Sequence, residues 1–149
     1  MKKLMILIIL SFGSMGCEFD QTLEYRIDVK LEKHVNQFFI EAEKRGISLY
    51  KENLIVSLQD CYDCVGQSIK IGEQRLIKIN KDDICWIENQ NNSQTAIENL
   101  IFHELGHTLL NRQHNDPKYS IMASGLSLYE YANDSLKRTV LIDELFYSR

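Results

Sequence analysis

The sequence predicts an α+β protein with a small mixed sheet, an N-terminal helix, a histidine-bearing helix and a C-terminal helix. Apolar residues at helical spacing near both ends of the chain support the helices, and β-prone runs between residues 54 and 83 support the sheet. A third observation is that three of the four histidines lie within residues 103–114. The chain has 149 residues without repeats or a change of composition, so one folded domain is expected.

The first sixteen residues have the layout of a secretory signal. Lys2 and Lys3 precede an apolar run, residues 4–12, and small residues precede Cys17. This run is too short to span a bilayer as a helix of the mature protein. A buried N-terminal helix is the alternative interpretation, but unbroken apolar residues after two lysines make a poor amphipathic pattern.

The stretch Ser14-Met15-Gly16-Cys17 resembles the lipobox of bacterial lipoproteins. The resemblance implies cleavage before Cys17 and acylation of that cysteine, with residues 1–16 as the signal peptide. Residues 17–24 would then be a tether and residues 25–149 the folded domain. Several acyl chains together hold a protein stably on a membrane, so the implied location is the bacterial cell envelope, at the outer membrane or the cell surface.

The charge of the chain bears on its partners. Removal of the signal takes away two of the 17 basic residues and none of the 21 acidic residues, which changes the formal charge from −4 to −6. An acidic domain without a basic stripe does not suit nucleic acid. We therefore expect no nucleic-acid partner.

Three cysteines remain once Cys17 is assigned to lipidation: Cys61, Cys64 and Cys85. An exported protein meets oxidising conditions, so one disulfide and one leftover thiol are expected. We expect Cys85 to pair with either Cys61 or Cys64, and the sequence does not choose between them. A three-thiolate metal site is the alternative, but no fourth ligand follows with zinc-ribbon spacing.

A first helix is expected over residues 25–45. Apolar residues recur there at helical spacing, and Gly46 follows as a C-terminal stop. His34 is the only histidine in this segment, and we expect it to be solvated or partly packed rather than a metal ligand.

Three short strands should follow, over residues 53–60, 65–72 and 75–83. A hairpin turn near Gly72 would join the second strand to the third. Cys85 and Trp86 are expected to end this β region, with Trp86 in the core or in the wall of a cleft.

The polar stretch 89–95 leads into the histidine-bearing helix, where Thr95 and Glu98 are spaced as a capping box. This helix should run to about Leu110, with a core stripe of Ile97, Ile101, Leu105, Thr108 and Leu109. Asp134 or Ser135 could cap a last helix. The inward face of that helix is expected to carry Leu136, Val140, Leu141 and Leu145.

The sequence His-Glu-x-x-His at 103–107 indicates a metal site. Four helical residues turn about 400°, so His103 and His107 project from the same side and can bind one zinc ion at about 2.1 Å. Glu104 can then reach a water on the metal and act as general base. Two histidines packed without a metal are the alternative, but Glu104 would then be buried unpaired in an apolar helix, which is costly.

The stretch resembles the metzincin metalloproteases, whose motif is His-Glu-x-x-His-x-x-Gly-x-x-His. In that clan the glycine ends the helix in a left-handed conformation and the chain returns with a third histidine. Here Leu110 and Gln113 stand at those two positions, but Asn111-x-x-His114 repeats the step one residue later. Asparagine is the usual substitute for glycine in a left-handed cap, so we expect Asn111 to end the helix and His114 to complete the site. Asp116, a downstream glutamate or no third side chain are the alternatives.

Met122 follows His114 by eight residues and matches the methionine that metzincins carry in a tight turn beneath the metal, the Met-turn. An ordinary core methionine is the alternative. Some metzincins place a tyrosine two residues after this methionine, where Ser124 stands here. Tyr129 or Tyr131 could substitute for it.

The chain also resembles a group of small bacterial zinc-metallopeptidase lipoproteins over roughly residues 54–147, most clearly at 100–122. This resemblance implies a metzincin-like fold with one zinc ion and leaves the substrate open.

We therefore expect a monomeric, envelope-anchored zinc peptidase, a metalloendopeptidase acting on a peptide or protein. A strand near residues 76–80 would border its cleft and pair with the substrate. One alternative is a surface binding lipoprotein that holds zinc without catalysis. The other is a gluzincin-type peptidase in which a downstream acid such as Glu130 is the third ligand.

Overall fold

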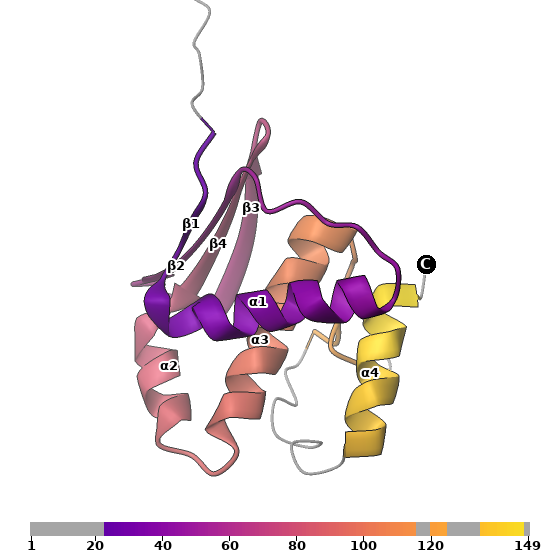
Figure 1. The fold of residues 1–149 in the computed structure, drawn as a ribbon. Helices are drawn as coiled ribbons and strands as arrows, with labels where there is room; N and C mark the ends of the chain where they lie inside the picture. Colours follow the sequence, from indigo (N-terminus) through magenta and orange to yellow (C-terminus); the bar gives the residue numbers. More distant parts are fainter. Residues whose placement is uncertain (1–22, 116–119, 125–134, 148–149) are drawn as a thin grey trace, which may run out of the picture.

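The computed structural model of the chain describes residues 23–115, 120–124 and 135–147. Over these residues it forms a four-stranded mixed sheet and four helices, which confirms the α+β expectation (Figure 1). The strands are β1 (Arg26–Ile27), β2 (Leu54–Gln59), β3 (Gly66–Ile71) and β4 (Gln74–Asn80). The helices are α1 (Val29–Lys44), α2 (Lys81–Glu88), α3 (Ser93–Leu110) and α4 (Ser135–Tyr147).

The sheet has the strand order β1-β2-β4-β3, which makes β3 an edge strand. β1, β2 and β4 run parallel, whereas β3 is antiparallel to β4 through a hairpin in which Gly72 adopts a positive φ of 59°. The strand expected to border the cleft, near residues 76–80, is therefore an inner strand paired on both sides. Its hydrogen-bonding groups are already used, whereas β3, which borders the cleft, pairs on one side only among the described residues.

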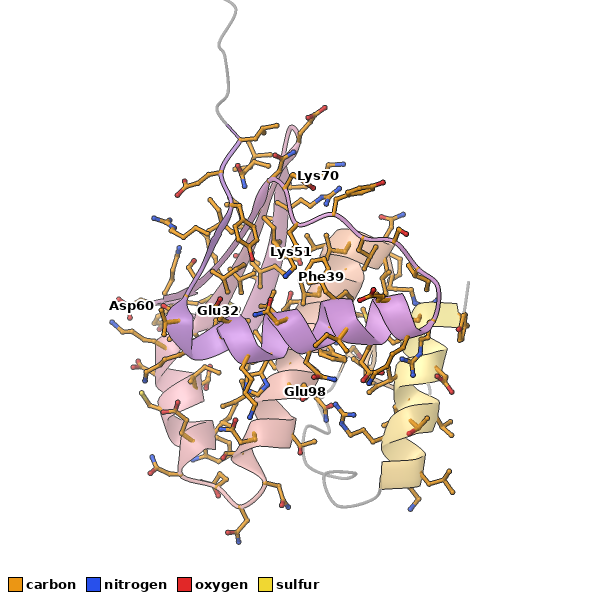
Figure 2. The ribbon with its side chains drawn as sticks, viewed as in Figure 1. Glu32, Phe39, Lys51, Asp60, Lys70 and Glu98 are labelled. Carbon is orange, nitrogen blue, oxygen red and sulfur yellow. A yellow bond between two sulfur atoms is a disulfide. The ribbon has the colours of Figure 1, made fainter. Side chains whose placement is uncertain are left out.

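The helices pack on one face of the sheet and bury a single apolar core (Figure 1). Phe38 of α1 meets Phe102 of α3 edge to face, with ring centroids 5.1 Å apart. From the sheet, Ile77 and Ile79 are fully buried in the same core. The connection after α1 is held against that helix, because Lys51 Nζ lies 4.9 Å from the centre of the Phe39 ring (Figure 2).

Helix α1 begins later than expected, because residues 26–27 form β1 instead. Asp28 caps α1 by accepting a hydrogen bond from the Lys30 amide at 3.0 Å. The helix ends before Gly46, whose φ of +70° confirms it as the stop. His34 is buried, lies 3.9 Å from a Glu98 oxygen, and has a pKa lowered by that burial and by Lys33.

The predicted end of the β region was wrong. Asn80 accepts a hydrogen bond from the Asp82 amide at 3.2 Å and thereby caps α2, which contains both Cys85 and Trp86. Trp86 lies on the outer face of this short helix and is 58% exposed, so it belongs to neither the core nor a cleft wall. The alternation of apolar and polar residues in β4 gave no indication that the chain changes from strand to helix at Asn80.

The disulfide expectation was also wrong. Cys61 pairs with Cys64, with Cα atoms 5.6 Å apart in one tight turn between β2 and β3. Cys85 carries a free and exposed thiol on α2. The local turn brings the first two cysteines together, whereas Cys85 is held on a separate helix.

The start of α3 and part of the inward face of α4 differ from the expected ones. Helix α3 begins two residues before Thr95, with left-handed Asn92 as its cap and no side-chain cap hydrogen bond, so the Thr95–Glu98 capping box does not form. Glu98 forms an ion pair with Arg138 instead. In α4 the buried residues are Ile142, Leu145 and Phe146, whereas Leu136 and Val140 are exposed. Leu145 is thus confirmed as an inward residue and Leu141 packs partly buried against the core, whereas the expectation for Leu136 and Val140 was wrong. Asp134 lies outside the described residues.

Within the described part of the chain, no helix is both long and apolar enough to cross a membrane. The expected signal, the tether up to residue 22 and Cys17 lie outside the residues that the structure describes.

Candidate metal centre

Helix α3 carries the first two histidines on its buried side. His103 and Glu104 are 5% and 4% exposed, while His107, one turn later, is half-buried. The ring centroids of His103 and His107 are 4.7 Å apart, as expected for residues four positions apart on one helix. The core stripe of this helix is confirmed for Ile97, Ile101 and Leu105, whereas Thr108 and Leu109 are only partly buried.

Asn111 ends α3 as expected, in a left-handed conformation with φ 54° and ψ 34°. The Arg112 amide then donates to the Gly106 carbonyl at 3.0 Å, which folds the chain back along the helix. This reversal brings His114 beside the first two histidines, with Nε2 of His114 3.1 Å from Nε2 of His103.

Met122 lies in a tight turn beneath the same helix. The Ala123 amide donates to the Ser120 carbonyl at 3.2 Å to close this turn, and Met122 is fully buried. A Cβ atom on Gly106 would approach the Met122 sulfur to 2.7 Å, so α3 passes closely over the turn because residue 106 is glycine. The Asn115 amide donates to the Met122 carbonyl at 3.0 Å and joins the turn to the His114 segment.

Backbone carbonyls orient two of the three imidazoles. Nδ1 of His103 lies 2.6 Å from the Ile121 carbonyl, and Nδ1 of His107 lies 2.7 Å from the Arg112 carbonyl. Since a carbonyl only accepts, each Nδ1 carries the proton and each Nε2 presents a lone pair. Burial lowers the pKa of His103 to about 4 and also lowers the pKa of His107, which keeps both rings neutral near pH 7.

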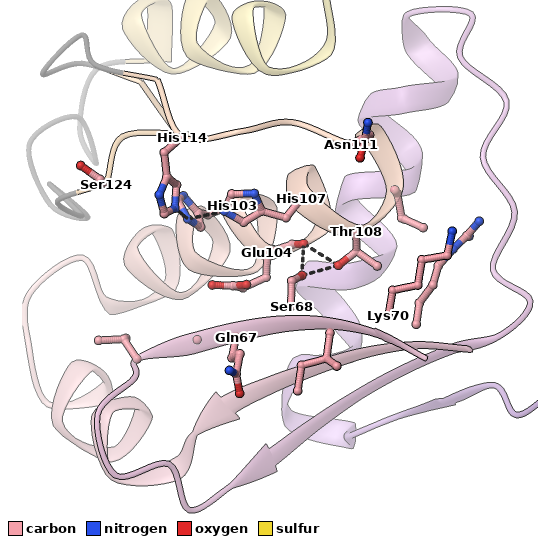
Figure 3. Close-up of a pocket in the computed structure, with 15 residues that line it drawn as sticks. Gln67, Ser68, Lys70, His103, Glu104, His107, Thr108, Asn111, His114 and Ser124 are labelled. Carbon is pink, nitrogen blue, oxygen red and sulfur yellow. Dashed lines mark hydrogen bonds between the residues drawn. The ribbon is translucent and has the colours of Figure 1, made fainter. Parts of the chain in front are cut away.

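The three Nε2 atoms converge on one point (Figure 3). Nε2 of His103 is 3.1 Å from Nε2 of both His107 and His114. Two unprotonated Nε2 atoms cannot donate to one another, so His103 and His107 face each other with lone pairs, an arrangement that a cation between them relieves. Nitrogens that share a tetrahedral zinc ion at about 2.1 Å are about 3.4 Å apart, so this donor set fits such an ion.

Glu104 lies on the strand side of the histidines, against β3 (Figure 3). Its Oε1 would be only 2.6 Å from a Cβ atom on Gly66, so the absence of a side chain there makes room for the carboxylate. Burial raises the pKa of Glu104 to about 7, and the nearby Ser68 hydroxyl opposes part of this rise. A carboxyl group with a pKa close to neutrality can both accept and release a proton.

Ser68 joins the edge strand to the histidine-bearing helix. Its hydroxyl donates to the Glu104 carbonyl at 2.9 Å and contacts the Thr108 hydroxyl. Thr108 also donates to the same carbonyl at 2.8 Å. The helix segment that carries Glu104 is thereby held at a fixed distance from β3.

A cleft of about 900 Å³ opens between β3 and α3 over this site. The three histidines and Glu104 lie toward one end, and Lys70 toward the other (Figure 3). The described residues that line it are Val65, Gly66, Gln67, Ser68, Ile69, Lys70, Arg75, His103, Glu104, His107, Thr108, Leu109, Asn111, His114 and Ser124.

The sequence predicted that His103, His107 and His114 lie together, as they do in the structure, but gave no sign of the groups that position them. The Ile121 and Arg112 carbonyls and Gly66 carry no motif, because a backbone oxygen and a missing side chain have no residue-type signature. Of the other candidates, Ser124 lines the cleft. Asp116, Glu130, Tyr129 and Tyr131 lie outside the described residues, and only His103, His107 and His114 form a possible metal-binding group among those described.

Comparisons with protein families, curated proteins and solved structures returned no match to this chain. A function for the protein therefore has to be inferred from the geometry of the metal centre and from the sequence.

Proposed function

We propose that the protein is a zinc-dependent peptidase of the metzincin-like type, a metalloendopeptidase with one zinc ion held by His103, His107 and His114. The observation that carries the proposal is the convergence of three imidazole Nε2 atoms, 3.1 Å apart in two of the pairs, beside a buried glutamate. Three protein ligands leave a position open for water or substrate, which is the arrangement of catalytic rather than structural zinc sites.

When bound, zinc supplies a Lewis acid that acidifies a water molecule and polarises a substrate carbonyl. Glu104 takes a proton from the attacking water and then delivers it to the leaving amine. Its pKa of about 7 suits both transfers. The Ile121 and Arg112 carbonyls hold the His103 and His107 rings in the tautomer that directs Nε2 into the site.

The free edge of β3 supports a peptide as substrate. This strand borders the cleft and, within the part of the chain that the structure describes, pairs only with β4, so its outer hydrogen-bonding groups are available to an extended chain. A substrate backbone paired with this edge of β3 would pass Glu104, because Glu104 contacts Gly66 at the start of the strand. This role belongs to β3 instead of the inner strand β4.

The metzincin-like assignment has three supports. Asn111 ends the helix in a left-handed conformation, His114 returns to the first two histidines, and Met122 lies in a tight turn below them. The proposal keeps Cys17 as the site of a lipid anchor at the bacterial envelope, on the strength of the lipobox-like sequence.

The test is zinc content and proteolysis by the full chain in detergent. Wild type should hold one zinc ion per chain and cleave a mixed peptide library, and chelation should abolish cleavage until zinc is restored. Glu104→Gln should retain the zinc and lose at least about 100-fold in kcat/KM, because general-base catalysis contributes roughly 10²–10⁴-fold. Glu88→Gln, at an exposed helix position, is the matched control.

Absence of stoichiometric metal in wild type would overturn the proposal. Zinc binding with no cleavage of any library member would instead favour the non-catalytic binding protein. Full zinc retention by His114→Ala would favour a downstream acidic ligand such as Glu130.

A further inference from the structure

The end of the cleft away from the histidines carries an unusual pair of positive charges. Lys70 on β3 lies directly opposite Arg75 on β4 in the antiparallel register, and both side chains line the cleft. Residues that alternate along a strand share a face, so Lys70 points to the same side as Gly66 and Ser68, toward α3 (Figure 3). Like charges directly opposite one another destabilise a sheet.

No acidic side chain among the described residues neutralises this pair. Within that part of the chain, neither Lys70 nor Arg75 forms an ion pair. The C-terminal end of α3, at Asn111, lines the same cleft and offers about half an elementary negative charge against two full positive charges. Positive charge is therefore in excess here, although the chain as a whole carries −4.

We propose that Lys70 and Arg75 form a subsite for an acidic side chain of the substrate, so that the enzyme prefers peptides with aspartate or glutamate at one distant position. This inference rests on the proposed peptidase function and names its substrate class. An anionic side chain between the two cations removes their mutual repulsion and replaces it with two ion pairs.

The position of that acidic residue follows from the strand. Lys70 is four residues beyond Gly66, which touches Glu104, and four residues of β-strand span about 13 Å. A peptide that extends along β3 has nearly the same rise per residue, so its side chain at the Lys70–Arg75 pair is about four residues from the scissile bond.

The experiment uses the zinc-loaded full chain in detergent and a neutral peptide that it cleaves at one mapped bond. Each peptide position is replaced in turn by aspartate or by its neutral isostere asparagine, and kcat and KM are measured for each pair. We expect one position, about four residues from the bond, at which aspartate is favoured roughly three- to tenfold, mainly through KM. Each exposed ion pair raises the affinity for the peptide by up to about fivefold. Added salt screens these pairs and should reduce the preference for aspartate.

Three variants locate the effect. Lys70→Gln and Arg75→Gln should each lose at least half of the aspartate preference, measured as the ratio of kcat/KM for the aspartate and asparagine peptides. Lys78→Gln is the matched control, because Lys78 lies on the same sheet but alternates to the opposite face from Arg75 and Ile77. It removes the same charge and should leave the preference unchanged.

A binding measurement separates this inference from the proposed function. Fluorescence anisotropy with labelled aspartate and asparagine peptides is carried out on Glu104→Gln, which needs no turnover. Selective binding of the aspartate peptide, lost in the Glu104→Gln/Lys70→Gln double variant, supports the subsite even if wild type cleaves nothing. Cleavage without an acidic preference, equal effects of Lys70→Gln and Lys78→Gln, or no peptide binding at all would overturn it.

Discussion

The contact between Glu104 and Gly66 gives the sharpest prediction, for the substitution Gly66→Ala. Gly66 has no positive φ, so alanine fits the strand backbone. The new Cβ atom would lie 2.6 Å from Glu104 Oε1, and ordinary contact begins at 3.4 Å, so the carboxylate must withdraw by about 0.8 Å. Its Cδ and Cγ atoms, at 3.0 Å from the same Cβ, must move as well.

A displacement of about 1 Å of a catalytic group costs roughly 100-fold in rate, which corresponds to about 2.7 kcal/mol of transition-state stabilisation. We therefore expect Gly66→Ala to lower kcat/KM about 100-fold. Zinc affinity should stay within about twofold, because the three atoms nearest to the new Cβ all belong to Glu104 and none to a histidine. The assay pairs peptide cleavage with zinc competition against a chromogenic chelator.

Lys78→Ala is the control for this experiment, since Lys78 alternates to the opposite face of β4 from Ile77 and is not among the described residues that line the cleft. It should cleave like wild type. Activity of Gly66→Ala within threefold of wild type would refute the placement of the general base against this strand. A parallel loss of zinc would instead mean that the substitution disturbs the whole site.

Three further predictions concern pH, the helix end and the turn. In metal-free protein, the raised pKa of Glu104 stabilises the fold below pH 4.5, and this contribution is lost as pH rises through about 7. The free energy of unfolding of wild type relative to Glu104→Gln, from urea titrations with chelator, should thus fall by about 2–3 kcal/mol over that range. Asn111→Ala should cost about 1–2 kcal/mol and weaken zinc binding, because alanine resists the left-handed conformation, whereas Asn111→Gly should preserve both. Met122→Ala should cost about 2–5 kcal/mol in thermal or urea unfolding, and Met122→Leu less than about 1.5 kcal/mol.

A different outcome would contradict each of these three predictions. The pH experiment needs the variant comparison because the lowered pKa of His103 acts in the opposite direction: its stabilisation is present above pH 6.5 and is lost as pH falls through about 4. If the free energy of unfolding of wild type relative to Glu104→Gln rises with pH, the raised pKa of Glu104 is contradicted. Equal zinc affinity in Asn111→Ala and Asn111→Gly would show that the left-handed cap does not position His114. Equal unfolding energies for the two Met122 variants would show that the turn tolerates a cavity.

The geometry of the three histidines was largely predictable because it is local. His103, Glu104 and His107 follow from helical periodicity, and Asn111 with His114 follow from the conformational preference of asparagine after a helix. These residues are close in sequence, so short-range rules place them. Whether the chain is a metzincin-like peptidase stays a prediction that the proposed assays address.

The parts that sequence reasoning missed depend on long-range packing. Alternation identified the strands but could not order them, so β4 was expected at the edge that β3 occupies. Cys61 and Cys64 form a disulfide because a local turn brings them together, and the number of cysteines in the chain does not predict that turn. The pairing of Lys70 with Arg75 appears only once the hairpin register is known.

The position of β1 has a practical consequence. This two-residue strand occupies the sheet edge farthest from β3, three inter-strand spacings or about 14 Å away. The Glu24 amide, just before β1, donates to Gln74 Oε1 at 2.9 Å, so this part of the chain lies at the hairpin end of the sheet, whereas Gly66 and Glu104 lie at the other end of β3. Affinity handles, fluorophores or solid supports attached at Leu23 should therefore leave the end of the cleft that holds the histidines accessible.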